Sequence, residues 1–209
     1  MAREEQNADR EKLAIERMYL GAPDAYGQSG FHGDAARWEA LRRPVMKAVN
    51  RAGSFLDIGC ANGLLLESAL KWAAEDGHRI DPFGLDHSAA LAELAKARLN
   101  IGGERVFVAE AMTWEPLRRF DFVRTELVYV PGARRLEYVR RLADRFLESG
   151  GRLVVASYGT RGGVPPAEPV GDWLRSSGFE VLGEAEGVDP WSHKILTRVA
   201  WLAAPATGP

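Results

Sequence analysis

Residues 54–68 read S-F-L-D-I-G-C-A-N-G-L-L-L-E-S, and this stretch sets the interpretation of the whole chain. It opens as an apolar run around Asp57, continues through Gly59 and Gly63, and becomes helix-forming from Leu64. The order predicts a buried parallel strand, a tight glycine turn and a helix whose first free N–H groups face the turn. Because glycine carries no side chain, a ligand can lie directly against the backbone of such a turn.

The turn lacks the features of the two commonest phosphate-binding motifs. No Gly-Lys-Ser/Thr follows the glycines, as a phosphate loop requires, and the third glycine of the dinucleotide fingerprint is missing. The carboxylate of Asp57 would also repel a bare polyphosphate, whereas it can accept hydrogen bonds from a cationic amine or a hydroxyl. The turn therefore favours a ligand that carries such groups.

The heptapeptide D-I-G-C-A-N-G closely resembles the D-x-G-x-x-x-G motif of class I S-adenosylmethionine-dependent methyltransferases. In that family the glycine turn receives the methionine end of the cofactor, and the acid helps to hold its amino group. The resemblance implies these roles for Asp57, Gly59 and Gly63. The remaining turn residues are assigned to the same cofactor site: Cys60, Ala61 and Asn62. The alternative is an ordinary turn between a strand and a helix, without a ligand.

The composition is that of one globular domain, since 209 residues can bury a full core. The formal net charge of -2 gives no global basic field that would recruit nucleic acid or an anionic membrane. Cys60 is the one cysteine, which excludes an internal disulfide and a multi-cysteine zinc site. No apolar run approaches the roughly 18 residues of a membrane span, and the N-terminus is too charged for a signal peptide. We therefore expect a cytoplasmic monomer or homodimer.

We expect an N-terminal helical cap over residues 1–50, a cofactor-binding core over 51–204 and a disordered tail over 205–209. Within the cap, residues 21–33 hold four glycines and a proline, which marks a loop. The same loop holds side chains that solvent alone would not favour: Tyr26, Phe31 and His32. They indicate a lid, with the two aromatic rings binding an acceptor and His32 assisting catalysis. The alternative is a mobile linker with incidental aromatic residues.

A second acid ends the next predicted strand, which covers residues 80–86. In open parallel sheets a ligand lies at the carboxyl ends of neighbouring strands, and a carboxylate there can bind both hydroxyls of a ribose. Class I methyltransferases carry an acid at this place, so the resemblance implies that Asp86 holds the ribose, with His87 near the adenosine. The alternative is that Asp86 only caps the following helix.

The third predicted strand, residues 105–109, is followed by Glu110 and Ala111. Methyltransferases of this class often place an acid and an alanine here, where the acid takes the adenine amino group. The resemblance gives that role to Glu110, although aspartate is the commoner residue, and Met112 is expected beside the purine.

The fourth predicted strand, residues 120–127, leads into the place where the methyl group and its acceptor should meet. Glu126 and Tyr129 are the groups there with acid–base or positioning capacity, and Thr125 is assigned to the acceptor pocket. The segment lacks the asparagine-proline-proline-aromatic signature of methyltransferases that act on adenine or glutamine amino groups. It also lacks an aspartate–asparagine cluster for magnesium, so we expect no metal.

The C-terminal part is predicted to complete the sheet. A fifth strand over residues 153–158 ends in Tyr158, which we assign to the acceptor pocket. Strands over residues 179–187 and 195–202 suggest an antiparallel hairpin. Its loop holds Trp191 and His193, which are either lining the acceptor pocket or simply exposed.

The predicted helix over residues 134–147 carries a row of arginines, which is the one feature that favours RNA. Acidic residues interleave with the row, and this is more typical of a solvated helix face. The chain adds no further domain for binding RNA or protein.

Together these features predict an α/β fold: a Rossmann-like doubly wound sheet, mostly parallel, with a C-terminal antiparallel hairpin strand and an N-terminal helical cap. The resemblance implies S-adenosylmethionine as cofactor and in-line methyl transfer to an oxygen or nitrogen atom of a small-molecule acceptor. Two alternatives stay open: an RNA or protein methyltransferase that uses the arginine helix, and a non-catalytic S-adenosylmethionine-binding partner or sensor.

Overall fold

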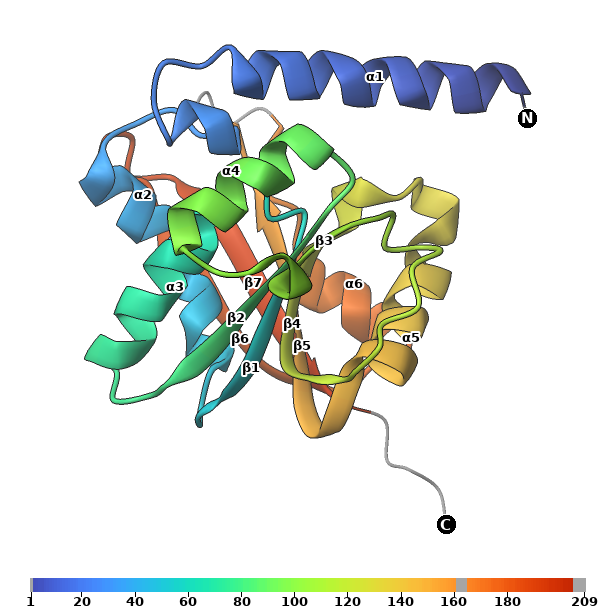
Figure 1. Cartoon of the computed structure of the whole chain (residues 1–209). Coiled ribbons are helices and arrows are strands. Elements are labelled where there is room, and N and C mark those ends of the chain that lie inside the picture. Colours follow the sequence, from blue (N-terminus) through green and yellow to red (C-terminus); the bar gives the residue numbers. More distant parts are fainter. Residues whose placement is uncertain (1, 161–164, 205–209) are drawn as a thin grey trace.

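The computed structural model describes residues 2–160 and 165–204, and a single sheet of seven strands forms its centre (Figure 1). The strand order is β3-β2-β1-β4-β5-β7-β6, and β7 runs antiparallel to the other six strands. The strands are β1 (Gly53–Ile58), β2 (Ile80–Asp86), β3 (Val106–Val108), β4 (Phe120–Glu126), β5 (Leu147–Tyr158), β6 (Val181–Val188) and β7 (Ile195–Ala203). The predicted doubly wound sheet with a C-terminal antiparallel hairpin is confirmed.

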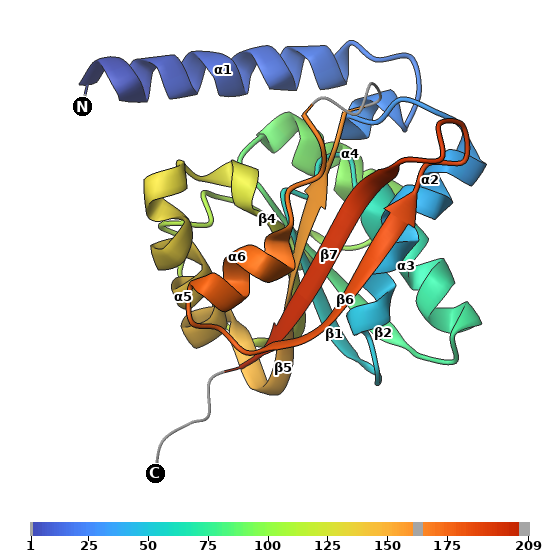
Figure 2. The same cartoon turned by 180° about the vertical axis from the view of Figure 1, so that it is seen from behind.

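Helices cover both faces of the sheet (Figure 2). They are α1 (Ala2–Leu20), α2 (Ala35–Arg42), α3 (Leu64–Glu75), α4 (Ala89–Leu99), α5 (Arg135–Phe146) and α6 (Val170–Ser176). The strand β1 serves both layers, because its successive side chains point to opposite faces. Phe55 packs with the cluster of α2, α3 and α4, whereas Leu56 and Ile58 pack with that of α5 and α6. A strand buried on both sides explains the continuous apolar run that the sequence shows.

The helical spacing of the apolar residues after Asp34 predicts one helix over residues 35–51 with Asp34 as its N-cap, and the structure departs from this prediction. Asp34 caps α2 as expected, accepting a hydrogen bond from the backbone N–H of Arg37 at 2.9 Å. The α-helix then ends at Arg42, and residues 43–48 form a 3₁₀-helix. Pro44 explains the change, because proline has no N–H to donate to an α-helical hydrogen bond.

The helix α1 crosses the molecule above the carboxyl ends of the parallel strands and projects beyond the body at its N-terminus (Figure 1). The next segment returns the chain to α2. Within residues 2–160 and 165–204, none of the helices combines the length and the apolarity that crossing a bilayer takes. The tail predicted over residues 205–209 lies outside the described residues.

Candidate active site

A pocket of about 630 Å³ opens at the carboxyl ends of β1, β2 and β4, with the last turns of α1 as its roof. This volume is in the range of small-molecule sites, roughly 300–1,000 Å³. Most of the predicted site residues line it: Asp57, Gly59, Cys60, Ala61, Asp86, His87, Glu110, Ala111, Met112, Glu126, Tyr129 and Tyr158. These predicted residues are up to 101 positions apart in the chain, from Asp57 to Tyr158.

The glycine turn has the geometry that its sequence predicts. Gly59 and Gly63 have positive φ angles of 74° and 77°, a conformation that other residues adopt only with strain. A Cβ at Gly59 would stand 2.4 Å from the hydroxyl oxygen of Tyr129, and one at Gly63 would stand 3.0 Å from Ala95. At position 59 the positive φ favours glycine, and any larger residue would also have to displace the side chain of Tyr129.

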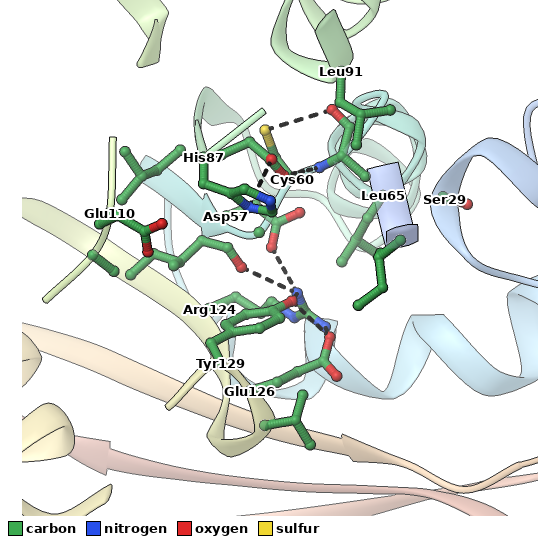
Figure 3. Close-up of a pocket in the computed structure, with 18 of the residues that line it drawn as sticks. Ser29, Asp57, Cys60, Leu65, His87, Leu91, Glu110, Arg124, Glu126 and Tyr129 are labelled. Atoms are coloured by element: carbon green, nitrogen blue, oxygen red, sulfur yellow. Dashed lines mark hydrogen bonds and ion pairs between the residues drawn. The ribbon is translucent and has the colours of Figure 1, made fainter. Parts of the chain in front are cut away.

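A buried ion-pair chain fills the floor of the pocket between β1 and β4 (Figure 3). The Nη1 atom of Arg124 donates to Asp57 Oδ1 at 3.0 Å, and its Nη2 atom donates to Glu126 Oε1 at 2.5 Å. Arg124 is 3% exposed and Asp57 1%, so both charges are removed from water. Such charges are tolerated only when they are paired.

Asp57 is only half paired. Its Oδ2 atom is buried and has no hydrogen-bond partner among the described residues. Burial raises the pKa of Asp57 to about 6, although Arg124 acts in the opposite direction. An orphaned carboxylate oxygen of this kind fits the amino group of an amino-acid ligand, which would supply the missing donor.

Tyr129 covers the glycine turn and belongs to the same network. Its hydroxyl group donates to Glu126 Oε1 at 2.9 Å and accepts a bond of 3.3 Å from Arg124. Tyr129 is 39% exposed as a whole, but the partial removal of its hydroxyl group from water, followed by the nearby charge of Glu126, raises its pKa well above the usual value. The phenol therefore stays protonated at neutral pH and acts as a donor.

Asp86 lies at the carboxyl end of β2 and is almost fully buried. Its Oδ2 atom accepts from the backbone N–H of Ala61 at 2.8 Å, and its Oδ1 atom accepts from that of Ser88 at 2.9 Å. Ser88 is the residue that caps α4, through a bond from the N–H of Leu91 to its hydroxyl oxygen. Asp86 thus ties the glycine turn of β1 to the helix that follows β2, while its carboxylate still lines the pocket.

The far side of the pocket is less enclosed. Glu110 is exposed and forms an ion pair with Lys12, which reaches down from α1. Ala111 and Met112 are half-buried beside it and line the pocket. The ion pair links the roof to the segment that follows β3, a contact for which the sequence held no signal.

Cys60 lies under the turn and is 3% exposed. Burial raises the pKa of its thiol well above the usual value. A Cβ at Gly84 of β2 would stand 2.7 Å from its Sγ atom, so the sulfur packs directly on the neighbouring strand. Cys60 contributes packing rather than a reactive thiolate.

Several residues predicted for the site lie away from the pocket. Thr125 is buried in the sheet, with its hydroxyl 2.6 Å from that of Tyr138, because alternate residues of β4 face opposite layers. Asn62 points toward the N-terminal segment and donates to the carbonyl oxygen of Ala25 at 2.9 Å. Gly63 serves as the N-terminal cap of α3.

The residues predicted for the lid are also placed differently. Phe31 is buried against Trp38, with the ring centroids 5.1 Å apart, and the ring of Tyr26 is 5.7 Å from that of Trp38. These rings form an aromatic cluster, so they are core residues rather than incidental ones. The side chain of His32 is exposed and does not line the pocket.

The hairpin loop between β6 and β7 does not reach the pocket. Trp191 is 48% exposed, and the guanidinium carbon of Arg37 lies 5.0 Å from its ring centroid. His193 is exposed and has a φ of 56°. Arg37 forms a buried ion pair with Asp189 at 2.6 Å, which anchors the loop to α2 instead.

Two arginines of the pocket were missed by the sequence interpretation. Arg124 had a usable signal, since it is a lone cation within the apolar run of β4 and a buried cation requires a partner. Arg42 had none, because it is one of several arginines in a helix that was interpreted only by its apolar face. Both side chains line the pocket.

No protein-family profile matches the sequence, and no curated protein matches it in sequence. Solved structures do match the fold. One is a 1,6-didemethyltoxoflavin-N1-methyltransferase of Burkholderia thailandensis, solved with 1,6-didemethyltoxoflavin and S-adenosylhomocysteine. It is 20% identical, with a TM-score of 0.63 over 96% of this chain and 89% of that chain.

Two further structures widen the comparison. The N-methyltransferase NodS of Bradyrhizobium japonicum WM9, in complex with S-adenosylhomocysteine, is 13% identical, with a TM-score of 0.60 over 92% of this chain and 97% of that chain. The [4+2]-cyclase SpnF is 19% identical, with a TM-score of 0.57 over 92% and 93% of the two chains. At these identities the likeness concerns the fold, and the chain has the fold of the class I S-adenosylmethionine-dependent methyltransferases.

Proposed function

We propose that the protein is an S-adenosylmethionine-dependent methyltransferase that acts on a small-molecule acceptor. The observation that carries this proposal is the meeting of Asp57, the glycine turn and Asp86 in one pocket at the carboxyl ends of β1 and β2. The fold is shared with enzymes of that activity, but a fold also hosts other chemistries, as the [4+2]-cyclase illustrates. The residues of the site therefore carry the proposal.

The residues present fit the cofactor. The unpartnered Oδ2 atom of Asp57 receives its amino group, the turn at Gly59 faces its amino-acid end, and Asp86 receives its ribose. Ala111 and Met112 flank its purine. The cofactor supplies a methyl group on a positively charged sulfur, which is already an activated leaving group.

On the acceptor side, Glu126 is the proposed general base. Its Oε1 atom is taken by Arg124 and Tyr129, and no bond to its Oε2 atom occurs among the described residues. Tyr129, which stays protonated, holds the carboxylate in place as a donor. Glu126 therefore accepts the acceptor's proton at Oε2, and Tyr129 and Arg124 are positioning residues.

Calorimetric titration with S-adenosylmethionine, S-adenosylhomocysteine and NAD tests the cofactor. We expect both adenosyl compounds to bind and NAD not to bind. The variant Asp86→Ala should weaken their binding by about 1–3 kcal/mol, the value of hydrogen bonds to a charged group. Asp81→Ala is the matched control, because Asp81 lies on the same strand, pairs with Arg105 and does not line the pocket. Failure of both adenosyl compounds to bind would sink the proposal.

Turnover tests the chemistry once an acceptor has been found by screening for release of S-adenosylhomocysteine. Glu126→Gln should lower kcat far more than it changes cofactor affinity, because the amide keeps the shape but cannot take the proton. Glu137→Gln on the exposed face of α5 is the control. An active Glu126→Gln enzyme would exclude Glu126 as the base. Binding without turnover on any acceptor would instead favour the partner or sensor function.

A further inference from the structure

Arg42 places a guanidinium group at the end of the pocket that Tyr158 lines. It is the last residue of α2, and its guanidinium carbon lies 3.6 Å from the ring centroid of Tyr158. The rings of Phe31 and Trp38 flank it at 5.1 and 5.3 Å. Aromatic faces favour a cation there but accept no N–H hydrogen bond of ordinary strength.

The other basic groups that line the pocket each have a carboxylate. Lys12 pairs with Glu110, and Arg124 pairs with Asp57 and Glu126. His87 lies 3.5 Å from the carboxylate of Asp86.

Arg42 differs, because it makes no ion pair and no side-chain hydrogen bond within residues 2–160 and 165–204. Burial lowers its pKa, which reflects the cost of holding a charge away from water. The hydroxyl oxygen of Tyr158 is likewise buried without a hydrogen-bond partner among the described residues. A cation and a hydroxyl group are thus left unsatisfied at the same end of the pocket.

The strand order separates this end from the proposed cofactor positions. Asp86 lies on β2 and the glycine turn follows β1, whereas Tyr158 ends β5, on the other side of β4. Neighbouring strands are about 4.8 Å apart, so the end of β5 is roughly 10 Å across the sheet from that of β1. Glu126, the proposed base, ends the strand between them. Arg42 therefore lies beyond the base, on the acceptor's side.

We propose that Arg42 binds an anionic oxygen group of the acceptor, a carboxylate or a phosphate. The inference rests on the proposed function and names the class of its substrate. A guanidinium group offers five N–H donors in a planar fork, which matches both anions with two parallel hydrogen bonds. The three rings around Arg42 make its surroundings less polar than water, which strengthens such a contact.

The test compares anionic probes with neutral ones of the same shape. Benzoate, phenyl phosphate and benzamide are titrated into the full-length protein, with and without S-adenosylhomocysteine. The wild type should bind the better of the two anions about tenfold or more tightly than benzamide. Arg42→Gln should remove that preference, and Arg42→Lys should keep part of it, because the charge remains while the fork is lost. Arg43→Gln is the matched control, since the neighbouring Arg43 pairs with Glu39 and Asp76 outside the pocket.

The amino-acid part of the cofactor also carries a carboxylate, which competes with the acceptor as the anion that Arg42 binds. S-adenosylhomocysteine and 5′-methylthioadenosine, which lacks the amino-acid part, are therefore titrated into the wild type and Arg42→Gln. Equal affinities of the two proteins for S-adenosylhomocysteine support the acceptor assignment. A loss confined to S-adenosylhomocysteine would overturn it in favour of the cofactor's carboxylate.

Two other outcomes would also overturn the inference: no preference for either anion in the wild type, and an unchanged preference in Arg42→Gln. A thermal melt shows whether Arg42→Gln folds. If it does not, Arg42→Lys alone decides. A preference of Arg42→Lys for the anion over benzamide as strong as that of the wild type would then contradict binding by the guanidinium group. Failure of the proposed function is distinguished by a different result, namely that S-adenosylhomocysteine does not bind the wild type. The anion titrations made without S-adenosylhomocysteine test Arg42 independently of that result.

Discussion

At the scale of single residues, Asp57 combines burial with one unpaired oxygen, and burial raises its pKa to about 6. An amino group of the cofactor is attracted only by the ionised carboxylate, which is lost as the pH falls through this value. We therefore expect the affinity for S-adenosylhomocysteine to be flat above about pH 7 and to fall below about pH 6, by at most about tenfold per unit. Calorimetry from about pH 5 to pH 8 measures it.

Asp57→Asn is the control for this pH dependence. The variant should bind weakly at every pH in the range, because the amide cannot ionise. A wild-type affinity that does not change down to about pH 5 would contradict the assignment of the amino group to Asp57.

Arg124 is held to the structure by the buried carboxylate of Asp57 and the partly buried carboxylate of Glu126, and its removal leaves both without this counter-charge. We expect Arg124→Leu to lower the free energy of unfolding by about 3–5 kcal/mol, the usual effect of breaking a buried ion pair. Urea denaturation measures the loss. Arg134→Leu is the comparison, since Arg134 is an exposed arginine paired with Glu137, and it should unfold like the wild type. Equal stability of the two variants would mean that Arg124 does not hold the pocket floor together.

The sequence identified the two acids of the pocket more readily than its two arginines. Asp57 lies next to the end of one apolar strand and Asp86 ends the next. Because the carboxyl ends of parallel strands meet at one edge of the sheet, the approach of the two acids follows from local pattern. The partners of Arg124 and Arg42 depend on which side chains the folded chain brings together. The bond from Arg124 to Asp57 joins positions 67 residues apart and lies outside any local pattern, whereas its bond to Glu126 joins positions two apart on one face of β4.

At the scale of elements, α1 supplies the roof of the pocket through its last turns, with Lys12, Ile15, Glu16 and Tyr19. The buried hydrophobic clusters contain no residue of this helix within the described ranges. We therefore expect removal of residues 1–20 to leave the cooperative unfolding transition in place and to weaken S-adenosylhomocysteine binding by about tenfold, through loss of enclosure. Calorimetry and thermal unfolding of the shortened protein check both parts.

Removal of residues 1–9 alone is the matched control, because every pocket-lining residue of α1 remains. This protein should bind as the full chain does. Equal binding by the protein that lacks residues 1–20 would show that the helix is no part of the site.

Element boundaries were predictable wherever a single residue fixes them. The second strand covers residues 80–86 as expected, and Asp34 and Ser88 cap the helices that follow them. The segment before β1 was harder, because Pro44 converts the end of the helix into a 3₁₀-turn. The loop over residues 21–33 is also held more tightly than its four glycines indicate, because the side-chain amide of Asn62 donates to the carbonyl oxygen of Ala25.

At the scale of the whole molecule, charge pairing argues against RNA as the substrate. Three of the five arginines of α5 and its flank are taken by acids: Arg134 by Glu137, Arg135 by Glu168 and Arg141 by Glu115. With a formal net charge of -2, we expect no binding of poly(U) at about 0.15 M salt, where screening is substantial. Fluorescence anisotropy measures it, and tight binding that weakens steeply with added salt would favour the RNA methyltransferase instead.

The fold class was the most predictable property of the molecule. Strands and helices alternate along the chain and a hairpin follows them, which indicates a mostly parallel sheet with an antiparallel strand, and nearly all parallel crossovers are right-handed. The division into a cap over residues 1–50 and a core stays a prediction. Trp38, Leu41 and Val45 of the proposed cap share one hydrophobic cluster with α3.

The buried thiol of Cys60 makes the protein its own reporter of access to the cofactor site. As the one cysteine of the chain, it can take up only one equivalent of a disulfide reagent such as 5,5′-dithiobis(2-nitrobenzoate). Reaction requires the turn to move away from β2, so its rate measures how often the site opens. We expect slow labelling of the folded protein, rapid labelling in denaturant, and a further slowing when S-adenosylhomocysteine is bound. A labelling rate that ligand leaves unchanged would place the opening motion elsewhere.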